Sequence, residues 1–159
     1  TNCPKVIKKP PDTKIPAKLI GRNNCLFQES TKKPILVYMK KVLIVEDDVN
    51  LGRTLAGILE VKKMVVHYSD GYDDVLHAFK QFAPDIILMD VMLPGDEDGF
   101  KIAGKIRKSK NPVPIIFITS LDGVSEMKKA FSFENTDYIS KPFRVQEVLL
   151  RMDKLLYTR

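Results

Sequence analysis

Carboxylates recur where the sequence pattern predicts that buried strands end. Glu46 and Asp47 follow the apolar run 42–45, and Asp90 follows the run 86–89. Neighbouring parallel strands lie about 4.8 Å apart, so we expect Asp47 and Asp90 to lie close together. Carboxylates that crowded repel each other unless a positive group lies between them. Mg²⁺ fits this role, because it prefers oxygen ligands and needs only one or two protein carboxylates beside waters, a carbonyl and a phosphate oxygen.

A hydroxyl and an ammonium group end the next two predicted strands. Thr119 closes the run 115–119, and Lys141 follows the run 138–140. Together these groups suit phosphoryl transfer to a carboxylate: Asp90 attacks, Mg²⁺ and Lys141 hold the phosphoryl oxygens, and Thr119 hydrogen-bonds one of them. The product would be an aspartyl phosphate.

The elements that must position these groups alternate regularly after residue 40. We predict strands at 42–45, 64–68, 86–89, 115–119 and 138–140. Several of these runs are apolar throughout, which is typical of strands buried on both faces of a parallel sheet. Helical periods between them give apolar faces, among them one formed by Val124, Met127 and Phe131. The pattern predicts a (βα)₅ α/β fold with a doubly wound parallel sheet, in which functional groups gather at the carboxyl ends of the strands.

The basic charge of the chain is confined to its first part. The net charge is +6, and residues 1–38 account for all of it with eight Lys/Arg and two Asp/Glu, while residues 39–159 are balanced. The arm also carries five of the ten prolines, so we expect residues 1–18 to be extended. We predict a basic Pro/Lys-rich extension over 1–38 and one domain over 39–159. The sequence leaves open whether the extension is native and whether it forms a hairpin or an added edge strand.

The lengths of the apolar runs and the number of cysteines indicate the cellular compartment of the protein. The longest unbroken apolar run has five residues, whereas a membrane-spanning helix needs about twenty. The chain opens with no signal-peptide pattern and has two cysteines, Cys3 and Cys25. We therefore expect no membrane span and a reducing, cytoplasmic setting.

Four sequence blocks in this order resemble the receiver domain of two-component response regulators across residues 40–157. They are VLIVEDD at 42–48, DIILMD with LP at 85–94, TS at 119–120 and DYISKPF at 137–143. The resemblance implies a five-stranded sheet with the flavodoxin-like strand order 2-1-3-4-5. It also implies a partner histidine kinase that supplies the phosphoryl group.

The same resemblance implies individual roles around the acidic pocket. Asp90 is similar to the phosphoacceptor, Asp47 to the carboxylate that binds Mg²⁺ directly, and Glu46 to the acid that acts through water. The carbonyl of Met92 matches the remaining protein ligand, although the acidic loop 91–98 is one residue longer than the usual pattern. By this resemblance the domain would catalyse its own Mg²⁺-dependent phosphorylation and slow dephosphorylation, without being a conventional turnover enzyme.

A switch and an output surface are implied as well. Lys141 matches the family's lysine, whose bond to the following proline is typically cis. Thr119 and Tyr138 match the switch pair, in which the hydroxyl moves toward the phosphoryl group and the ring moves inward. The added negative charge would shift the surface formed by the fourth helix, fifth strand and fifth helix.

Charged residues on that surface resemble the dimer face of the winged-helix DNA-binding subfamily. They are Lys128, Lys129, Asp137, Glu147 and Arg151. Cross-subunit pairs among them, such as Asp137 with Arg151, would make a weak and switchable homodimer. A solvated helical face is the alternative. Our hypothesis is that the chain is the receiver half of a transcription regulator whose DNA-binding domain lies outside this sequence.

Several polar residues have plainer interpretations. Asp48 and Asp98 precede predicted helices, so we interpret both as helix caps. Asn135 replaces the usual glycine before the last strand and can take a left-handed conformation at small cost. His67 and His77 lie outside the predicted pocket.

Other functions remain as alternatives. A flavodoxin-like ligand-binding module is disfavoured, because the loop after the first predicted strand is acidic where a phosphate ligand would need glycine and hydroxyl donors. Nucleic-acid binding through the basic arm is disfavoured because the arm lacks interleaved aromatics and a helix-turn-helix pattern. A stand-alone interaction receiver without DNA output is the remaining alternative.

Overall fold

The chain divides into two units, Thr1–Tyr38 and Met39–Arg159. The computed structural model describes residues 25–28, 35–71, 74–120 and 123–157. In the first unit, strand β1 (Cys25–Gln28) pairs with β2 (Ile35–Tyr38) in an antiparallel, two-stranded sheet. Residues 1–18, for which we predict an extended conformation, lie outside the described residues.

Five parallel strands form the sheet of the second unit. They are β3 (Lys41–Val45), β4 (Val65–Ser69), β5 (Ile86–Met89), β6 (Ile115–Thr119) and β7 (Thr136–Ser140). Their spatial order is β4-β3-β5-β6-β7, which is 2-1-3-4-5 within this unit. The predicted fold class and strand order are therefore confirmed.

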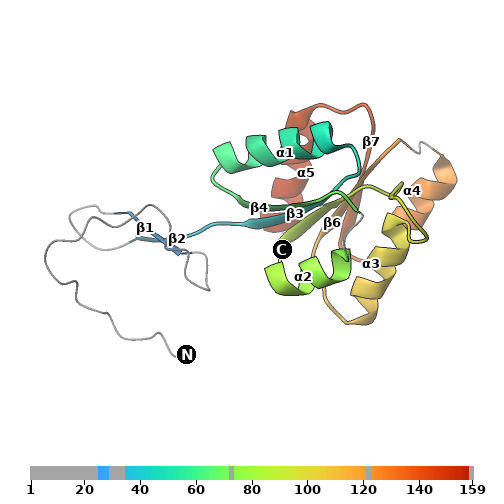
Figure 1. The fold of residues 1–159 in the computed structure, drawn as a ribbon, viewed down its shortest axis with the longest axis horizontal. Helices are drawn as coiled ribbons and strands as arrows, with labels where there is room; N and C mark the ends of the chain where they lie inside the picture. The colour runs from blue at the N-terminus through green and yellow to red at the C-terminus, as the bar shows by residue number, and fades with distance from the viewer. Residues whose placement is uncertain (1–24, 29–34, 72–73, 121–122, 158–159) are drawn as a thin grey trace, which may run out of the picture. The chain divides into compact units, whose positions relative to one another are not determined.

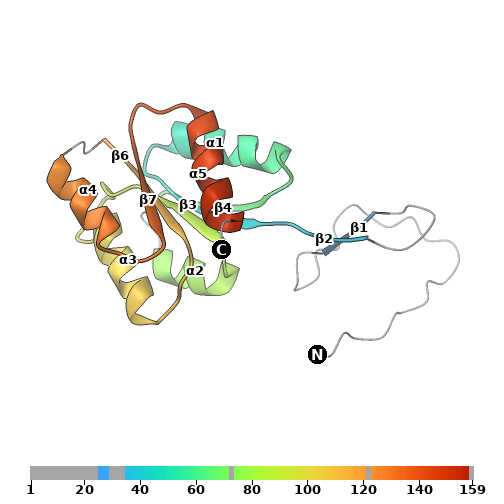
Figure 2. The same ribbon diagram turned by 180° about the vertical axis from the view of Figure 1, so that it is seen from behind.

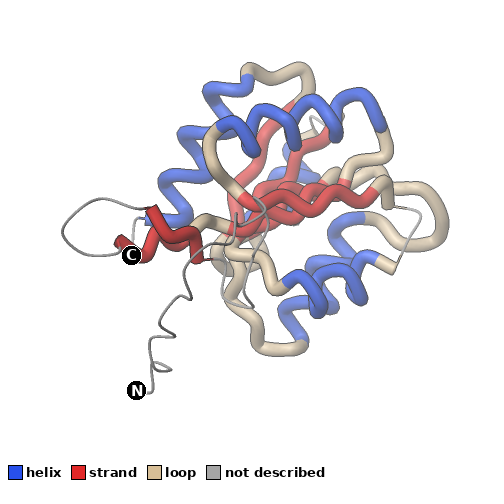
Figure 3. Tube along the Cα trace, turned by 60° about the vertical axis from the view of Figure 1, so that its left-hand side comes forward, coloured by secondary structure: helices blue, strands red, loops and turns tan. Residues whose placement is uncertain are grey.

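Helices cover both faces of this sheet, as Figures 1 and 2 show from opposite sides. They are α1 (Val49–Val61), α2 (Val75–Phe82), α3 (Gly99–Lys108), α4 (Val124–Phe131) and α5 (Val145–Tyr157). Helices α1 and α5 lie on one face, and α2, α3 and α4 lie on the other, which leaves the strands in the middle layer (Figure 3).

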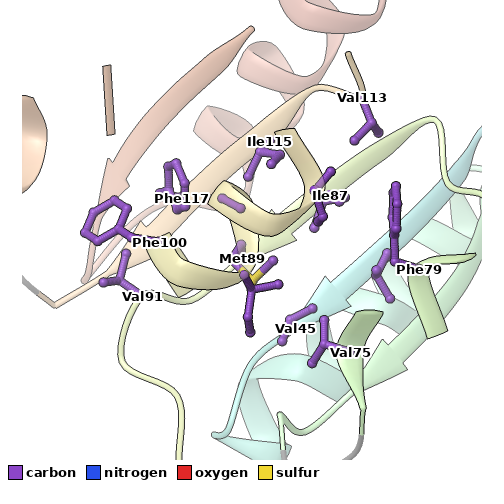
Figure 4. Close-up of a cluster of buried hydrophobic side chains, with 14 of the residues drawn as sticks. Val45, Val75, Phe79, Ile87, Met89, Val91, Phe100, Val113, Ile115 and Phe117 are labelled. Atoms are coloured by element: carbon purple, nitrogen blue, oxygen red, sulfur yellow. The ribbon is translucent and has the colours of Figure 1, made fainter. Parts of the chain in front are cut away.

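Alternate side chains of each strand enter two separate cores. Leu43 and Val45 point toward α2 and α3, whereas Val42 and Ile44 point toward α1 and α5. Phe117 packs against α3 in the first core, which Figure 4 shows in close-up. Because both faces of the sheet are buried, its strands read as continuous apolar runs.

Helix α4 departs from the expected packing. Val124, Met127 and Phe131 do form one stripe, but they are 69%, 40% and 56% exposed. The helix contacts the core through Ala130, which is completely buried on a different side of the helix. The expectation that this stripe forms a core face is wrong, because a small side chain lets α4 pack closely without it.

The helix caps and the turn before β7 agree with the sequence predictions. Asp48 Oδ1 accepts hydrogen bonds from the backbone N–H groups of Asn50 and Leu51, and Asp98 caps α3 in the same way through Lys101. Asn135 has a φ of 56°, the left-handed conformation expected there.

Candidate functional site

The corner between β3 and α1 holds two carboxylates in different surroundings. Glu46 is buried, and its backbone N–H donates to the carbonyl of Ser69 at 3.1 Å. The hydroxyl of Tyr68 donates to the carbonyl of Glu46 at 2.9 Å. Asp47, the next residue, is exposed. Asp48 is engaged in capping α1, so Glu46 and Asp47 are the acids of this corner that remain for binding.

Asp90 lies beside this corner because β5 pairs with β3. The register joins Val45 to Met89, and the backbone N–H of Asp90 donates to the carbonyl of Val45 at 2.8 Å. The side chain is buried, and its Oδ1 accepts the backbone N–H of Met92 at 2.8 Å. At the start of α3, a Cβ on Gly99 would lie 2.1 Å from the carbonyl oxygen of Asp90, so only glycine fits there.

Lys141 joins the two buried carboxylates. Its Nζ lies 2.6 Å from Asp90 Oδ2 and 2.7 Å from Glu46 Oε1. The backbone N–H of Lys141 donates to the carbonyl of Thr119 at 2.8 Å, which extends the pairing of β7 with β6 to the edge of the sheet. The peptide bond before Pro142 is cis, as expected. Residues 95 positions apart in the sequence thus meet at one ammonium group.

Burial and charge shift two pKa values in this cluster. Burial raises the pKa of Glu46, while the hydrogen bond and charge of Lys141 oppose the rise. For Lys141, burial acts to lower the pKa, but hydrogen bonds to Asp90 and Glu46 and the charges of both acids outweigh it, so its pKa is raised. Lys141 therefore stays an ammonium ion at neutral pH.

Three carboxylates converge closely enough to bind a metal ion. Ligand oxygens of Glu46, Asp47 and Asp90 all lie within 4.8 Å of one another. Asp47 and Met92 also line a pocket of about 600 Å³ on the surface of the unit. A cluster of three carboxylates offers only oxygen donors and can bind a hard divalent cation.

The remaining predicted residues lie near this edge of the sheet or on the surface beside it. Thr119 is completely buried at the end of β6, and Tyr138 is buried against the first core. Met92 is exposed in the loop after β5. His67 and His77 are exposed on β4 and α2, outside the cluster of carboxylates.

Three of the charged surface residues, Asp137, Glu147 and Arg151, pair with one another within the chain. Arg151 Nη1 lies 2.8 Å from Asp137 Oδ1, and its Nη2 lies 2.9 Å from Glu147 Oε1 within the same chain. Arg151 is one helical turn after Glu147 on α5, which brings its guanidinium over β7. Lys128 and Lys129 are exposed on α4, and the Nζ of Lys129 lies 4.5 Å from the ring centroid of Phe100.

Sequence reasoning missed Tyr68. It predicts no functional group from the second strand of the domain, yet the Tyr68 hydroxyl binds the carbonyl between the two acids Glu46 and Asp47. The available signal was a tyrosine next to the end of a strand that neighbours β3. That signal is weak, because every residue has a backbone carbonyl, and the sequence therefore does not show which carbonyl a tyrosine contacts.

The described part of the chain is a doubly wound α/β domain with an acidic cluster at the carboxyl ends of its strands, and comparison with known sequences names the family. Residues 42–153 match the model of the response regulator receiver domain, so the chain belongs to that family. Receiver domains of this family interact with histidine kinases. No helix in the described part of the chain is long and apolar enough to cross a membrane.

Similar proteins include regulators and isolated receiver domains. The chain is 37% identical over 116 residues to the uncharacterized transcriptional regulatory protein YbdJ of Bacillus subtilis, covering 73% of this chain and 50% of that protein. It is 34% identical over 119 residues to the transcriptional regulatory protein RprY of Bacteroides fragilis, covering 73% and 49%. The chain spans about half the length of these curated relatives.

A solved structure supports the same fold. The non-phosphorylated HemR receiver domain from Leptospira biflexa is 31% identical and superposes with a TM-score of 0.69, covering 74% of this chain and 94% of that one. The chain is thus a receiver domain of two-component response regulators, with transcriptional regulators among its homologues.

Proposed function

We propose that Asp90 accepts a phosphoryl group from a sensor histidine kinase. The observation that carries this proposal is the contact of one lysine with two buried acids, Lys141 Nζ to Asp90 Oδ2 and to Glu46 Oε1. A buried carboxylate with a fixed ammonium group at 2.6 Å is prepared to attack a phosphorus atom whose oxygens the ammonium group can then bind.

The groups around Asp90 have separate tasks in this reaction. An oxygen of Asp90 attacks the phosphorus, and the phosphorus–nitrogen bond to the kinase histidine breaks. Lys141 transfers its hydrogen bond from Asp90 to an oxygen of the incoming group, and the Thr119 hydroxyl binds another oxygen. Glu46 is buried and Asp47 is exposed, so in this proposal Asp47 is the more accessible of the two acids to an incoming donor.

Mg²⁺ is the cation that this site would hold. Asp47 and Asp90 would bind it directly together with the carbonyl of Met92, while Glu46 would bind through water. The cation would supply positive charge to the transferring phosphoryl group. The oxygen-only donor set and the convergence of three acids support this assignment.

The output would be regulation of transcription. Thr119 and Tyr138 would form the switch that changes the surface of α4, β7 and α5, through which the domain would form a homodimer. The unpacked stripe of α4 and the exposed Lys128 and Lys129 support a surface that exchanges partners. In this proposal residues 39–159 are a cytoplasmic receiver unit, residues 1–38 are an extension, and DNA is bound by a domain outside this sequence.

Acetyl phosphate tests the phosphoacceptor. With Mg²⁺, the wild-type chain should gain about 80 Da by mass spectrometry, the mass of one phosphoryl group, and should lose it in alkali. Asp90→Ala should gain nothing. Equal labelling of Asp90→Ala would show that the phosphoacceptor is a different residue.

A further inference from the structure

Tyr68 is tied to the acidic corner at two points. It lies on β4, where it pairs with Ile44 of β3, and its half-buried side chain extends past the end of β3. There the hydroxyl donates to the carbonyl of Glu46 at 2.9 Å. The next residue of β4, Ser69, accepts the backbone N–H of Glu46 at 3.1 Å. Consecutive residues of β4 therefore hold both backbone polar groups of Glu46.

The Glu46 carbonyl belongs to the peptide group from which Asp47 starts. Because a peptide group is planar, fixing its oxygen also fixes the direction in which the backbone enters Asp47. The Glu46 side chain is separately held by Lys141 at 2.7 Å. A hydrogen bond to this carbonyl thus bears on the position of the exposed carboxylate of Asp47.

The ring of Tyr68 makes the second contact, with α1. A Cβ built on Gly52 would lie 2.2 Å from Cε2 and 2.8 Å from Cζ of Tyr68. Real Cβ atoms do not approach so closely, so the ring occupies the space that any other side chain at position 52 would need. Gly52 lies in the first turn of α1, and its N–H donates to the carbonyl of the cap residue Asp48 at 2.8 Å. Tyr68 therefore contacts the backbone immediately before Asp47, at Glu46, and the first turn of the following helix, at Gly52.

The ionisation state of Tyr68 suits a donor. Burial raises the pKa of its hydroxyl, and the negative charges of Asp70 and Glu46 act in the same direction. The hydroxyl keeps its proton at neutral pH, which the hydrogen bond to a carbonyl oxygen requires.

We infer that Tyr68, together with Gly52, is a positioning residue that sets the Glu46–Asp47 peptide and thereby the geometry of the cation-binding carboxylates. This inference rests on the proposed function of the acidic pocket. It assigns a role to the second strand of the domain, which supplies no side chain to the pocket itself.

Mn²⁺ binding to the full chain tests the inference, with free Mn²⁺ measured by electron paramagnetic resonance. Tyr68→Phe removes one hydrogen bond and keeps the ring, so we expect Mn²⁺ affinity to fall about three- to tenfold. Tyr157→Phe is the matched control, because Tyr157 is an exposed tyrosine at the end of α5, and it should leave the affinity unchanged. Circular dichroism at the same temperature confirms that each variant is folded.

A second pair of variants separates positioning from general destabilisation. Gly52→Ala should weaken Mn²⁺ binding when Tyr68 is present, because the new methyl group displaces the ring. In a Tyr68→Ala background the space is empty, and Gly52→Ala should then change the affinity little. Equal effects of Gly52→Ala in both backgrounds would overturn the role of the ring contact.

The outcomes also distinguish this inference from the proposed function. If the folded wild-type chain binds no Mn²⁺, the cation site itself is wrong and the inference falls with it. If the wild type binds Mn²⁺ and Tyr68→Phe binds it equally well, the positioning role alone is refuted.

Discussion

Two buried aspartates of the second unit, Asp90 after the end of β5 and Asp137 near the start of β7, are each paired with a cation but lie in different surroundings. Asp90 and Asp137 are each 4% exposed, and each has a cation within hydrogen-bond distance, Lys141 at 2.6 Å and Arg151 at 2.8 Å. Similar burial and similar pairing therefore do not by themselves distinguish a reactive carboxylate from a structural one.

The charge balance around the two groups does distinguish them. At Asp90, Lys141 pairs with two of three converging carboxylates, Asp90 and Glu46, and Asp47 is the third. The acids outnumber the cation, so the cluster gains from a divalent ion.

At Asp137 the charges are balanced within the chain. Arg151 binds Asp137 and Glu147, and Lys154 Nζ lies 3.9 Å from the second oxygen of Asp137. Two acids meet two cations, so this cluster has no surplus charge for a metal ion to neutralise. Under the proposed function, the difference between the clusters assigns the reactive site to the one in which acids outnumber cations, rather than to any buried acid.

Removing each cation should give the largest contrast. Lys141→Ala should slow phosphorylation by acetyl phosphate roughly 100-fold, because a preorganised charge that stabilises the transferring group is lost. Arg151→Ala should leave that rate unchanged. The rates are measured by intact-mass time courses.

Lys141→Ala should nevertheless still bind Mn²⁺, since the three carboxylates remain. A folded Lys141→Ala chain that no longer binds the ion would contradict the role given to this lysine.

Removing Asp137, whose charge is balanced by cations, should lower the free energy of unfolding and leave the phosphorylation rate unchanged. Asp137→Ala leaves the half-buried Arg151 with Glu147 alone, and we expect a loss of about 1–2 kcal/mol in the free energy of unfolding. Urea denaturation measures the loss, and the phosphorylation rate serves as the internal control. A large drop in that rate, in a chain that remains folded, would erase the distinction between the two clusters.

The smallest expected effect of the surplus negative charge is on the pH dependence of the free energy of unfolding. Because the pKa of Glu46 is raised above 4.5 in the folded chain, the folded state binds the proton more tightly than the unfolded state does. In chelator, the contribution of Glu46 to stability should therefore be greatest below pH 4.5 and should decline as pH rises from there through the folded-state pKa.

Glu46→Gln isolates this effect, because the neutral amide cannot titrate. The unfolding free energy of Glu46→Gln relative to wild type should rise across the same pH interval. A difference that stays flat with pH would mean that Glu46 titrates alike in the folded and unfolded chains.

Contacts that depend on strand order or on local spacing could be predicted from the sequence. Asp47 and Asp90 meet because β3 and β5 pair in parallel, and residues after paired parallel strands gather at one edge. The caps at Asp48 and Asp98 were predictable because they depend on local spacing alone.

Contacts that depend on side-chain reach were not predictable. The hydrogen bond from Tyr68 is accepted by a backbone carbonyl, and since every residue has one, the residue types do not reveal the acceptor. The exposed stripe of α4 has the same period as a buried one, and only the tight packing of Ala130 decides which side faces the core. The pairing of Asp137 with Arg151 within one chain likewise depends on where α5 lies over β7.

The central claim is that the excess of carboxylates over cations around Asp90 creates a cation site. Measuring the Mn²⁺ bound to matched variants tests this claim most directly. Wild type and Asp137→Asn should each bind one ion with similar affinity, whereas Asp90→Asn should bind it at least tenfold more weakly, because a carboxylate ligand has become a neutral amide. If Asp90→Asn binds Mn²⁺ as tightly as wild type, or if Asp137→Asn loses binding to the same extent, the charge surplus does not define the site.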